Sequence, residues 1–165
     1  MNEALLLPVV EQTLAQHDMA YTTHACTPEL ADTAVFCEHY GVALDQAANT
    51  ILVASRKVEP AKYAVCVTLG TTRLDVNQKV CELLEVKKAS FADAETTMSR
   101  TGMMIGGVTA VGISDTPIYV DSAVMRQQEV VMGGGNRSSK IRLDPHELLK
   151  LPNVTVIDGL ARPRE

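Results

Sequence analysis

GGVTAVG at residues 106–112 and GGGNR at residues 133–137 are the two stretches around which the rest of this sequence is organised. Each glycine cluster lies beside apolar runs that are typical of β-strands. Glycine in such a place indicates a turn with positive φ or a close approach of the backbone to another group. A tight turn explains either loop alone, but two such loops indicate a pocket lined by main-chain N–H and C=O groups. That lining suits a carbonyl or phosphate oxygen, or a developing oxyanion.

The composition is that of a folded globular protein. A length of 165 residues predicts a single domain over residues 1–165, and 46% hydrophobic with 21% charged residues argues against disorder. No apolar run approaches the roughly 18–20 residues of a membrane helix, and the N-terminus lacks a basic region before its apolar patch. We therefore expect a cytoplasmic protein without a membrane partner.

The net charge and the spacing of cysteine and histidine argue against two classes of protein, broad nucleic-acid binders and metalloproteins. The net charge of −5 argues against broad nucleic-acid binding but leaves room for a local basic rim at residues 56–57, 87–88 or 137–142. The four cysteines and four histidines form no Cys-x-x-Cys pair or His-x-x-x-His spacing. We expect buried free thiols, no metal site and no cofactor.

Hydrophobic periodicity predicts a mixed α+β chain in which strands outnumber helices. We expect helices over residues 8–17, 32–40, 76–84, 92–100 and 144–150 and a helical turn over 44–47, with a frayed tail at 162–165. We expect strands over residues 21–24, 49–54, 62–68, 86–89, 118–121, 129–132, 140–143 and 154–157. The pair 49–54 and 62–68, joined by a short turn, forms the best-supported hairpin.

Several common catalytic motifs do not occur. Residues 106–112 lack the Gly-Lys-Ser/Thr of a phosphate-binding loop, and no Gly-x-Gly-x-x-Gly follows a first strand. No Gly-x-Ser-x-Gly elbow is found either.

A series of short motifs nevertheless resembles a known family. In order, it comprises NTILV at 49–53, AVCVT at 64–68, LD at 74–75, KK at 87–88, TG at 101–102, GGVTAVG at 106–112, YVD at 119–121 and GGNR at 134–137. The series is similar to the YbaK/prolyl-tRNA-synthetase-associated domain family and extends over about residues 22–157. The resemblance implies a single-domain α+β fold with a mixed, half-barrel-like β-sheet flanked by helices. It also implies hydrolysis, in trans, of the ester that joins a wrong amino acid to tRNA.

Site residues follow from this resemblance and from the chemistry. An aminoacyl ester is already activated, so backbone amides can stabilise its oxyanion without a metal, while the terminal ribose hydroxyl helps to orient water. The expected catalytic residues are Asn49, Gly106, Gly107 and Thr109, with the two glycines as oxyanion donors. The expected substrate-binding residues are Tyr21, Thr50, Ala110, Gly134, Gly135, Arg137 and Lys140. The implied partner is the acceptor end of a mischarged tRNA, and a synthetase partner is left open.

Three positions depart from the family pattern. Asn49 stands where active members generally carry a lysine, so it can donate a hydrogen bond but supplies no charge. Ala110 replaces a proline that would fix φ in the first loop. Lys140 occupies a position that is often acidic in the bacterial subgroup compared.

Two interpretations follow from these departures. In one, the chain is a diverged, non-catalytic binding module for an aminoacyl group, a nucleotide or a partner protein. In the other, Lys140 supplies from the opposite wall the cation that is missing at Asn49, and an exposed Lys140 far from Asn49 would eliminate this idea. A third, weaker alternative is an esterase for small amino-acid esters.

Overall fold

The computed structural model describes residues 5–163. Its α-helices are α1 (Pro8–Gln16), α2 (Thr33–Tyr40), α3 (Cys81–Leu84), α4 (Ala94–Thr101) and α5 (Ser122–Met125), with short helices of other pitch η1 (Pro28–Leu30), η2 (Leu44–Gln46), η3 (Val76–Val80) and η4 (Pro145–Lys150). Its strands are β1 (Thr22–Ala25), β2 (Ala48–Ser55), β3 (Tyr63–Leu69), β4 (Thr72–Leu74), β5 (Ala89–Phe91), β6 (Ile118–Asp121), β7 (Val130–Gly133), β8 (Ser139–Leu143), β9 (Val154–Ile157) and β10 (Ala161–Pro163).

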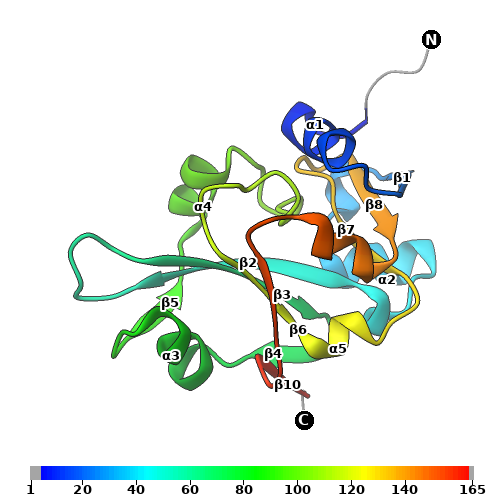
Figure 1. Cartoon of the computed structure of the whole chain (residues 1–165). Coiled ribbons are helices and arrows are strands. Elements are labelled where there is room, and N and C mark those ends of the chain that lie inside the picture. Colours follow the sequence, from blue (N-terminus) through cyan, green and yellow to red (C-terminus); the bar gives the residue numbers. More distant parts are fainter. Residues whose placement is uncertain (1–4, 164–165) are drawn as a thin grey trace.

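A five-stranded mixed sheet forms the centre of the molecule, in the order β5-β2-β3-β6-β9. β2 and β3 form an antiparallel hairpin in which Asn49 lies opposite Thr68, and this confirms the predicted pair. β6 joins β3 in parallel, and β9 joins β6 in parallel. Helices flank this sheet (Figure 1), so the predicted α+β fold with a mixed sheet and flanking helices is confirmed.

A second, antiparallel sheet has the order β1-β8-β7, and the second glycine-rich loop joins its strands β7 and β8. It connects with the start of β2 through a bridge between Ala47 and Val131. The end of β7 therefore lies beside the start of β2. In Figure 1 this second sheet lies at the same end of the molecule as α1, whereas β4 and β10 lie near the C-terminus.

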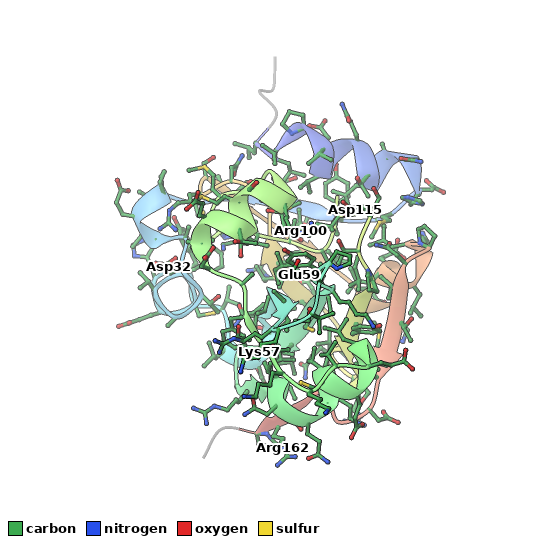
Figure 2. All side chains as sticks on the ribbon, turned by 90° about the vertical axis from the view of Figure 1, so that its left-hand side faces the viewer. Asp32, Lys57, Glu59, Arg100, Asp115 and Arg162 are labelled. Carbon is green, nitrogen blue, oxygen red and sulfur yellow. The ribbon has the colours of Figure 1, made fainter. Side chains whose placement is uncertain are left out.

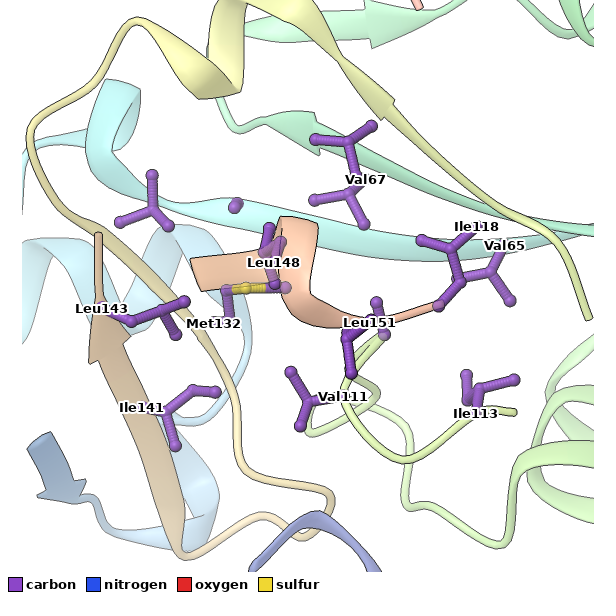
Figure 3. Close-up of a cluster of buried hydrophobic side chains, with 14 of the residues drawn as sticks. Val65, Val67, Val111, Ile113, Ile118, Met132, Ile141, Leu143, Leu148 and Leu151 are labelled. Atoms are coloured by element: carbon purple, nitrogen blue, oxygen red, sulfur yellow. The ribbon is translucent and has the colours of Figure 1, made fainter. Parts of the chain in front are cut away.

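The main hydrophobic core lies between the two sheets. Figure 3 shows side chains from β3, β7 and β8 converging there, among them Val67, Met132 and Ile141. Leu148 and Leu151 cover this core from the η4 segment. Burial of apolar surface contributes about 25 cal/mol per Å², so this cluster is the principal stabilising element. It also holds the start of β2 and the end of β7, where the pocket described below lies.

Helix ends follow the local sequence. Gly41 and Gly102 end α2 and α4 in the left-handed conformation, with φ of +70° and +71°. Asp75 and Asp93 accept hydrogen bonds from the N–H groups of Gln78 and Thr96 and so cap their helices. These start and stop signals are why most helix predictions agree with the structure to within two residues.

Three predicted segments are wrong in detail. The strand expected at residues 86–89 is β5 at Ala89–Phe91, because α3 ends at Leu84 with Glu85 as its left-handed C-cap, and the chain needs three further residues to reach β2. The tail expected from residue 162 is paired as far as Pro163 with β4, and residues 164–165 lie outside the described range. The last predicted helix forms as the tighter η4.

No helix within residues 5–163 is long and apolar enough to cross a membrane. Within the same residues, no cluster of three His, Cys, Asp or Glu side chains could hold a metal ion. The four cysteines are free and buried.

Candidate active site

A pocket of about 310 Å³ opens where the two sheets meet. It is bounded by the N-terminus of α2, the start of β2, the first glycine-rich loop and the end of β7. Its apolar walls include Phe36, Leu52, Val108 and Met132, and its polar groups include Asn49, Thr50 and Lys140. A mostly apolar hollow with a few convergent polar groups is the usual form of a small-molecule site, and this volume is at the small end of that class.

Lys140 is the charged group most deeply set in this pocket. It lies on β8 between Gly133 of β7 and His24 of β1 and is only 6% exposed. Its Nζ donates to the carbonyl oxygens of Ala31 at 2.7 Å and Gly106 at 2.8 Å. An ammonium carries three protons, so one remains for a group in the pocket.

The surroundings of Lys140 determine its titration. Burial lowers the pKa of its ammonium below the ordinary value, and the neighbouring Cys26 and Asp32 oppose this shift only in part. The Lys140 Nζ also lies 5.4 Å from the centre of the Phe36 ring, within the range of a cation–π contact. A desolvated ammonium interacts with a polar substrate atom far more strongly than a hydrated one.

Asn49 lies in the same pocket as Lys140. Its Oδ1 accepts a hydrogen bond from the Thr33 hydroxyl at 2.5 Å, and this fixes the amide at the N-terminus of α2. With the oxygen engaged, the side-chain NH₂ is the group available to a ligand; within residues 5–163 it has no partner. Lys140 is thus buried and lines the same pocket as Asn49. An exposed Lys140 far from Asn49 would have eliminated the hypothesis that Lys140 supplies the cation missing at Asn49, and this is not what the structure has.

The two glycine-rich loops lie against each other. The N–H of Gly135 donates to the Gly107 carbonyl at 2.7 Å, and the N–H of Met104 donates to the Gly135 carbonyl at 3.0 Å. A Cβ on Gly107 would overlap the backbone of Asn136, so only glycine permits this approach. The pairing turns two separate turns into one pocket wall.

Main-chain donors of the first loop differ in their availability. The N–H of Gly107 already donates to the Met104 carbonyl at 2.9 Å, so its predicted role as an oxyanion donor has no support in the geometry. The N–H groups of Gly106 and Val108 make no hydrogen bond within the described part of the chain, and both residues line the pocket. Val108 therefore takes the place of Gly107 as a candidate donor.

Arg137 holds the pocket rim together. Its Nε donates to the Pro28 carbonyl at 3.1 Å, and its Nη1 donates to the Ile105 carbonyl at 2.8 Å and to the Asp32 carboxylate at 3.1 Å. These contacts join the segment before α2 to the first glycine-rich loop. The guanidinium thus holds the loop in place and does not line the pocket. Arg137 was predicted to contact the substrate, and this position does not support that role.

The remaining predicted residues separate into lining and supporting positions. Thr50 lines the pocket, and its Oγ1 accepts the N–H of Ala110 at 3.1 Å, so this contact replaces the stiffness that a proline at 110 would give. Thr109 is fully buried and its Oγ1 accepts the Val111 N–H, so it supports the loop. Gly134 accepts the Leu7 N–H through its carbonyl. Ala110, Gly134 and Gly135 belong to the two glycine-rich loops but do not line the pocket themselves.

Tyr21 lies outside the pocket, contrary to its predicted role at the pocket mouth. It precedes β1, which runs antiparallel to β8 with His24 opposite Lys140. At about 3.3 Å per residue, three residues of strand place Tyr21 about 10 Å from that position. The antiparallel pairing carries it away from the site.

Sequence reasoning missed most of the apolar lining. The lining residues that were not predicted are Asp32, Thr33, Phe36, Ala47, Ala48, Ile51, Leu52, Phe91, Ala92, Thr97, Ile105, Val108, Val131, Met132 and Gly133. The N-terminus of α2 was predicted from its cap and stop signals, but nothing in its sequence marks its first turn as part of a site. Val108 and Gly133 belong to the two glycine-rich stretches, and residues 51–52 belong to the motif at 49–53, but none of them was predicted as a site residue.

Comparisons with known proteins identify the family and the fold. Residues 27–151 match the aminoacyl-tRNA editing domain family. The chain is 30% identical over 129 residues, 78% of this chain and 76% of the relative, to YwhH, an uncharacterised protein of Bacillus subtilis (strain 168).

Two crystal structures share the fold. The hypothetical protein APE2540 superposes with a TM-score of 0.82 at 21% identity, covering 93% of this chain and 99% of that one. A proposed trans-editing enzyme for prolyl-tRNA synthetase superposes with a TM-score of 0.78 at 22% identity, covering 96% and 99%. At these identities the likeness concerns the fold, whereas the match over residues 27–151 concerns descent. This chain belongs to the aminoacyl-tRNA editing domain family.

Proposed function

We propose that the protein is a deacylase that hydrolyses, in trans, the ester of a mischarged aminoacyl-tRNA. The observation that carries this proposal is the convergence of the desolvated Lys140 ammonium with the uncommitted N–H groups of Gly106 and Val108 in one pocket. These groups are donors, and the Asp32 carboxylate, which also lines the pocket, is paired with the Arg137 guanidinium at 3.1 Å. Donors on the lining of one small hollow suit the carbonyl oxygen of an acyl group.

The reaction requires little besides these donors. Water adds to the ester carbonyl carbon, and negative charge develops on the carbonyl oxygen. The C–O bond to the terminal ribose then breaks, the water oxygen stays on the amino acid, and a proton goes to the ribose oxygen. The vicinal ribose hydroxyl of the substrate orients the attacking water. Each oxyanion donor contributes about 10²–10³ in rate.

Asn49 and Lys140 divide the task of the lysine found in related active proteins. In this proposal the Lys140 ammonium contacts the acyl carbonyl, and the Asn49 NH₂ group contacts a neighbouring oxygen of the ester or ribose. The Lys140 contact to the Gly106 carbonyl also holds the loop in place, so the cation supports the donors as well as the substrate.

The pocket suits a small amino acid. Its volume of about 310 Å³ also has to hold the ester and part of the ribose, and its inner walls are Phe36, Leu52 and Met132. Synthetases reject smaller or near-isosteric amino acids by only roughly 10–200-fold, so a second hydrolytic pocket of limited size corrects their errors.

A panel of tRNAs mischarged with alanine, cysteine, serine or threonine tests the proposal. The wild-type protein is expected to release free amino acid from at least one of them. Asn49→Lys, which restores the usual family residue beside Lys140, reports whether a second cation is tolerated. Absence of release from all four species would refute the proposal.

The second candidate is a binding module without hydrolysis. Asn49 at the lysine position and Ala110 at the proline position favour it, because both weaken known parts of the active pattern. Such a module would bind aminoacyl-tRNA and protect the ester. A small-molecule esterase, the third alternative, would hydrolyse amino-acid ethyl esters as efficiently as the tRNA-linked ones.

A further inference from the structure

A second groove, of about 770 Å³, lies next to the pocket. Its walls come from β4, the start of η3, the end of β5 and β10. The residues that line it are Arg73, Leu74, Asp75, Val76, Asn77, Phe91, Arg162 and Pro163. No role in the proposed hydrolysis accounts for this groove.

Phe91 joins the groove to the pocket, because it lines both. It is 57% exposed, the highest value among the exposed large hydrophobic side chains of residues 5–163. Its backbone is fixed by pairing with Val53, and the next residue, Ala92, donates to the Leu52 carbonyl at 2.9 Å. A solvent-exposed aromatic ring on a fixed stretch of backbone, at the boundary of two cavities, offers a stacking surface.

The charges of the groove favour an anionic ligand. Arg162 pairs with the Asp75 carboxylate at 3.1 Å, and Asp75 also caps the following helix, so the acid in the groove is already neutralised. Arg73 is exposed and its guanidinium has no partner within the described residues. In Figure 2, Arg162 lies at the lower end of the molecule, well away from Asp32 on the pocket rim.

We propose that this groove holds the unpaired 3′ end of the tRNA, with Phe91 stacked on a base and Arg73 and Arg162 contacting backbone phosphates. The inference rests on the proposed function, since the ester must lie in the pocket on the other side of Phe91. Aromatic stacking combined with arginine contacts to phosphates is the common mode of single-strand recognition. It reads no sequence, which suits an end shared by all tRNAs.

Binding of uncharged RNA tests the inference without any chemistry. The probe is a fluorescent acceptor-stem minihelix with its unpaired 3′ end, compared with the same duplex trimmed blunt, and the readout is Kd by anisotropy. Loss of one base stack makes Phe91→Ala roughly 5- to 100-fold weaker for the tailed probe, whereas Phe91→Trp retains the affinity. The blunt probe is expected to bind weakly and equally to all variants.

Salt dependence tests the phosphate contact. Arg73→Ala is expected to reduce the slope of log K against log salt by about 0.7, the value for one single-strand phosphate. Arg56→Ala is the matched control, because Arg56 is also exposed but lines neither cavity. Arg162→Ala is less informative alone, since it also breaks the link to Asp75.

The outcomes separate this inference from the proposed function. If Phe91→Ala binds the tailed probe as wild type does, or if Arg56→Ala loses as much as Arg73→Ala, the groove is not the site of the 3′ end. Hydrolysis by the wild-type protein would stand in that case. Conversely, tail-dependent binding without amino-acid release would support the groove and refute the deacylase.

Discussion

Lys140→Met is the substitution whose effects on activity and stability are most clearly separated by the structure. Methionine keeps an unbranched side chain, one atom shorter, and removes the charge. The change deletes the hydrogen bonds to the carbonyls of Ala31 and Gly106. It also removes the cost of burying an ammonium in a residue that is only 6% exposed.

These two effects on stability oppose each other. Two hydrogen bonds from a charged donor are worth about 1.5–3 kcal/mol each, and desolvation of a buried ion costs several kcal/mol. The net change in the free energy of unfolding is therefore small, about 2 kcal/mol in either direction. The rate of deacylation is expected to fall by about 10²–10³, the effect of losing one oxyanion donor.

The assay is single-turnover release of amino acid from mischarged tRNA, with the melting temperature measured on the same samples. Lys62→Met is the control, because the Lys62 Nζ also donates to a carbonyl, that of Leu84 at 3.0 Å, but lies outside the pocket. Lys140→Met hydrolysing within threefold of wild type, while folded, would refute the role given to this ammonium.

The pH dependence provides a second test of the same residue. Burial lowers the pKa of Lys140 in the folded protein, so between that value and about 10.4 the unfolded chain binds more protons. Stability from this group therefore rises as pH increases through that window, while deacylation falls as the ammonium is lost. Lys140→Met should lack both changes. Rates must be corrected for the spontaneous hydrolysis of the ester in alkali.

Two further predictions concern the support of the pocket, and a third concerns the burial of Cys66. Thr50→Val leaves the Ala110 N–H without its acceptor and should lower the free energy of unfolding by about 1–3 kcal/mol in urea titrations, whereas Thr50→Ser should behave as wild type. Gly107→Ala forces a Cβ into the Asn136 backbone and should cost at least about 1–3 kcal/mol together with most of the activity; a stable, active variant would show that the loops do not pack as described. Burial raises the pKa of the Cys66 thiol to about 12, so this thiol should react with a disulfide reagent at pH 8 only after unfolding. The label is detected by mass spectrometry, and rapid labelling of Cys66 in the native protein would contradict its burial.

The fold could be predicted largely from local signals. The hairpin of β2 and β3 and the ends of α2 and α4 follow from strand alternation, caps and glycine stops. The pairing of β4 with β10 could not be predicted, because it joins residues 72–74 and 161–163 through a contact between distant segments. Two three-residue strands carry too little periodicity to be recognised.

Of the candidate site, four positions were predicted from the sequence, and the apolar lining and the first turn of α2 were missed. Asn49, Thr50, Gly106 and Lys140 were expected from sequence and line the pocket. The exchange of Gly107 for Val108 as a donor depends on which N–H closes the turn with Met104, and no sequence pattern specifies that. Apolar lining residues carry no signal of their own, since they have the same character as core residues.

The proposal that Lys140 and the N–H groups of the first glycine-rich loop bind the acyl carbonyl can be tested by a crystal structure. The ligand is a stable aminoacyl-adenosine amide, in which nitrogen replaces the ester oxygen. We expect the aminoacyl group of this ligand to lie inside the pocket of about 310 Å³. Its carbonyl oxygen should lie within about 3.2 Å of the Lys140 Nζ or of the N–H groups of Gly106 and Val108. An aminoacyl group bound outside this pocket, or a carbonyl oxygen that contacts none of these donors, would contradict the account.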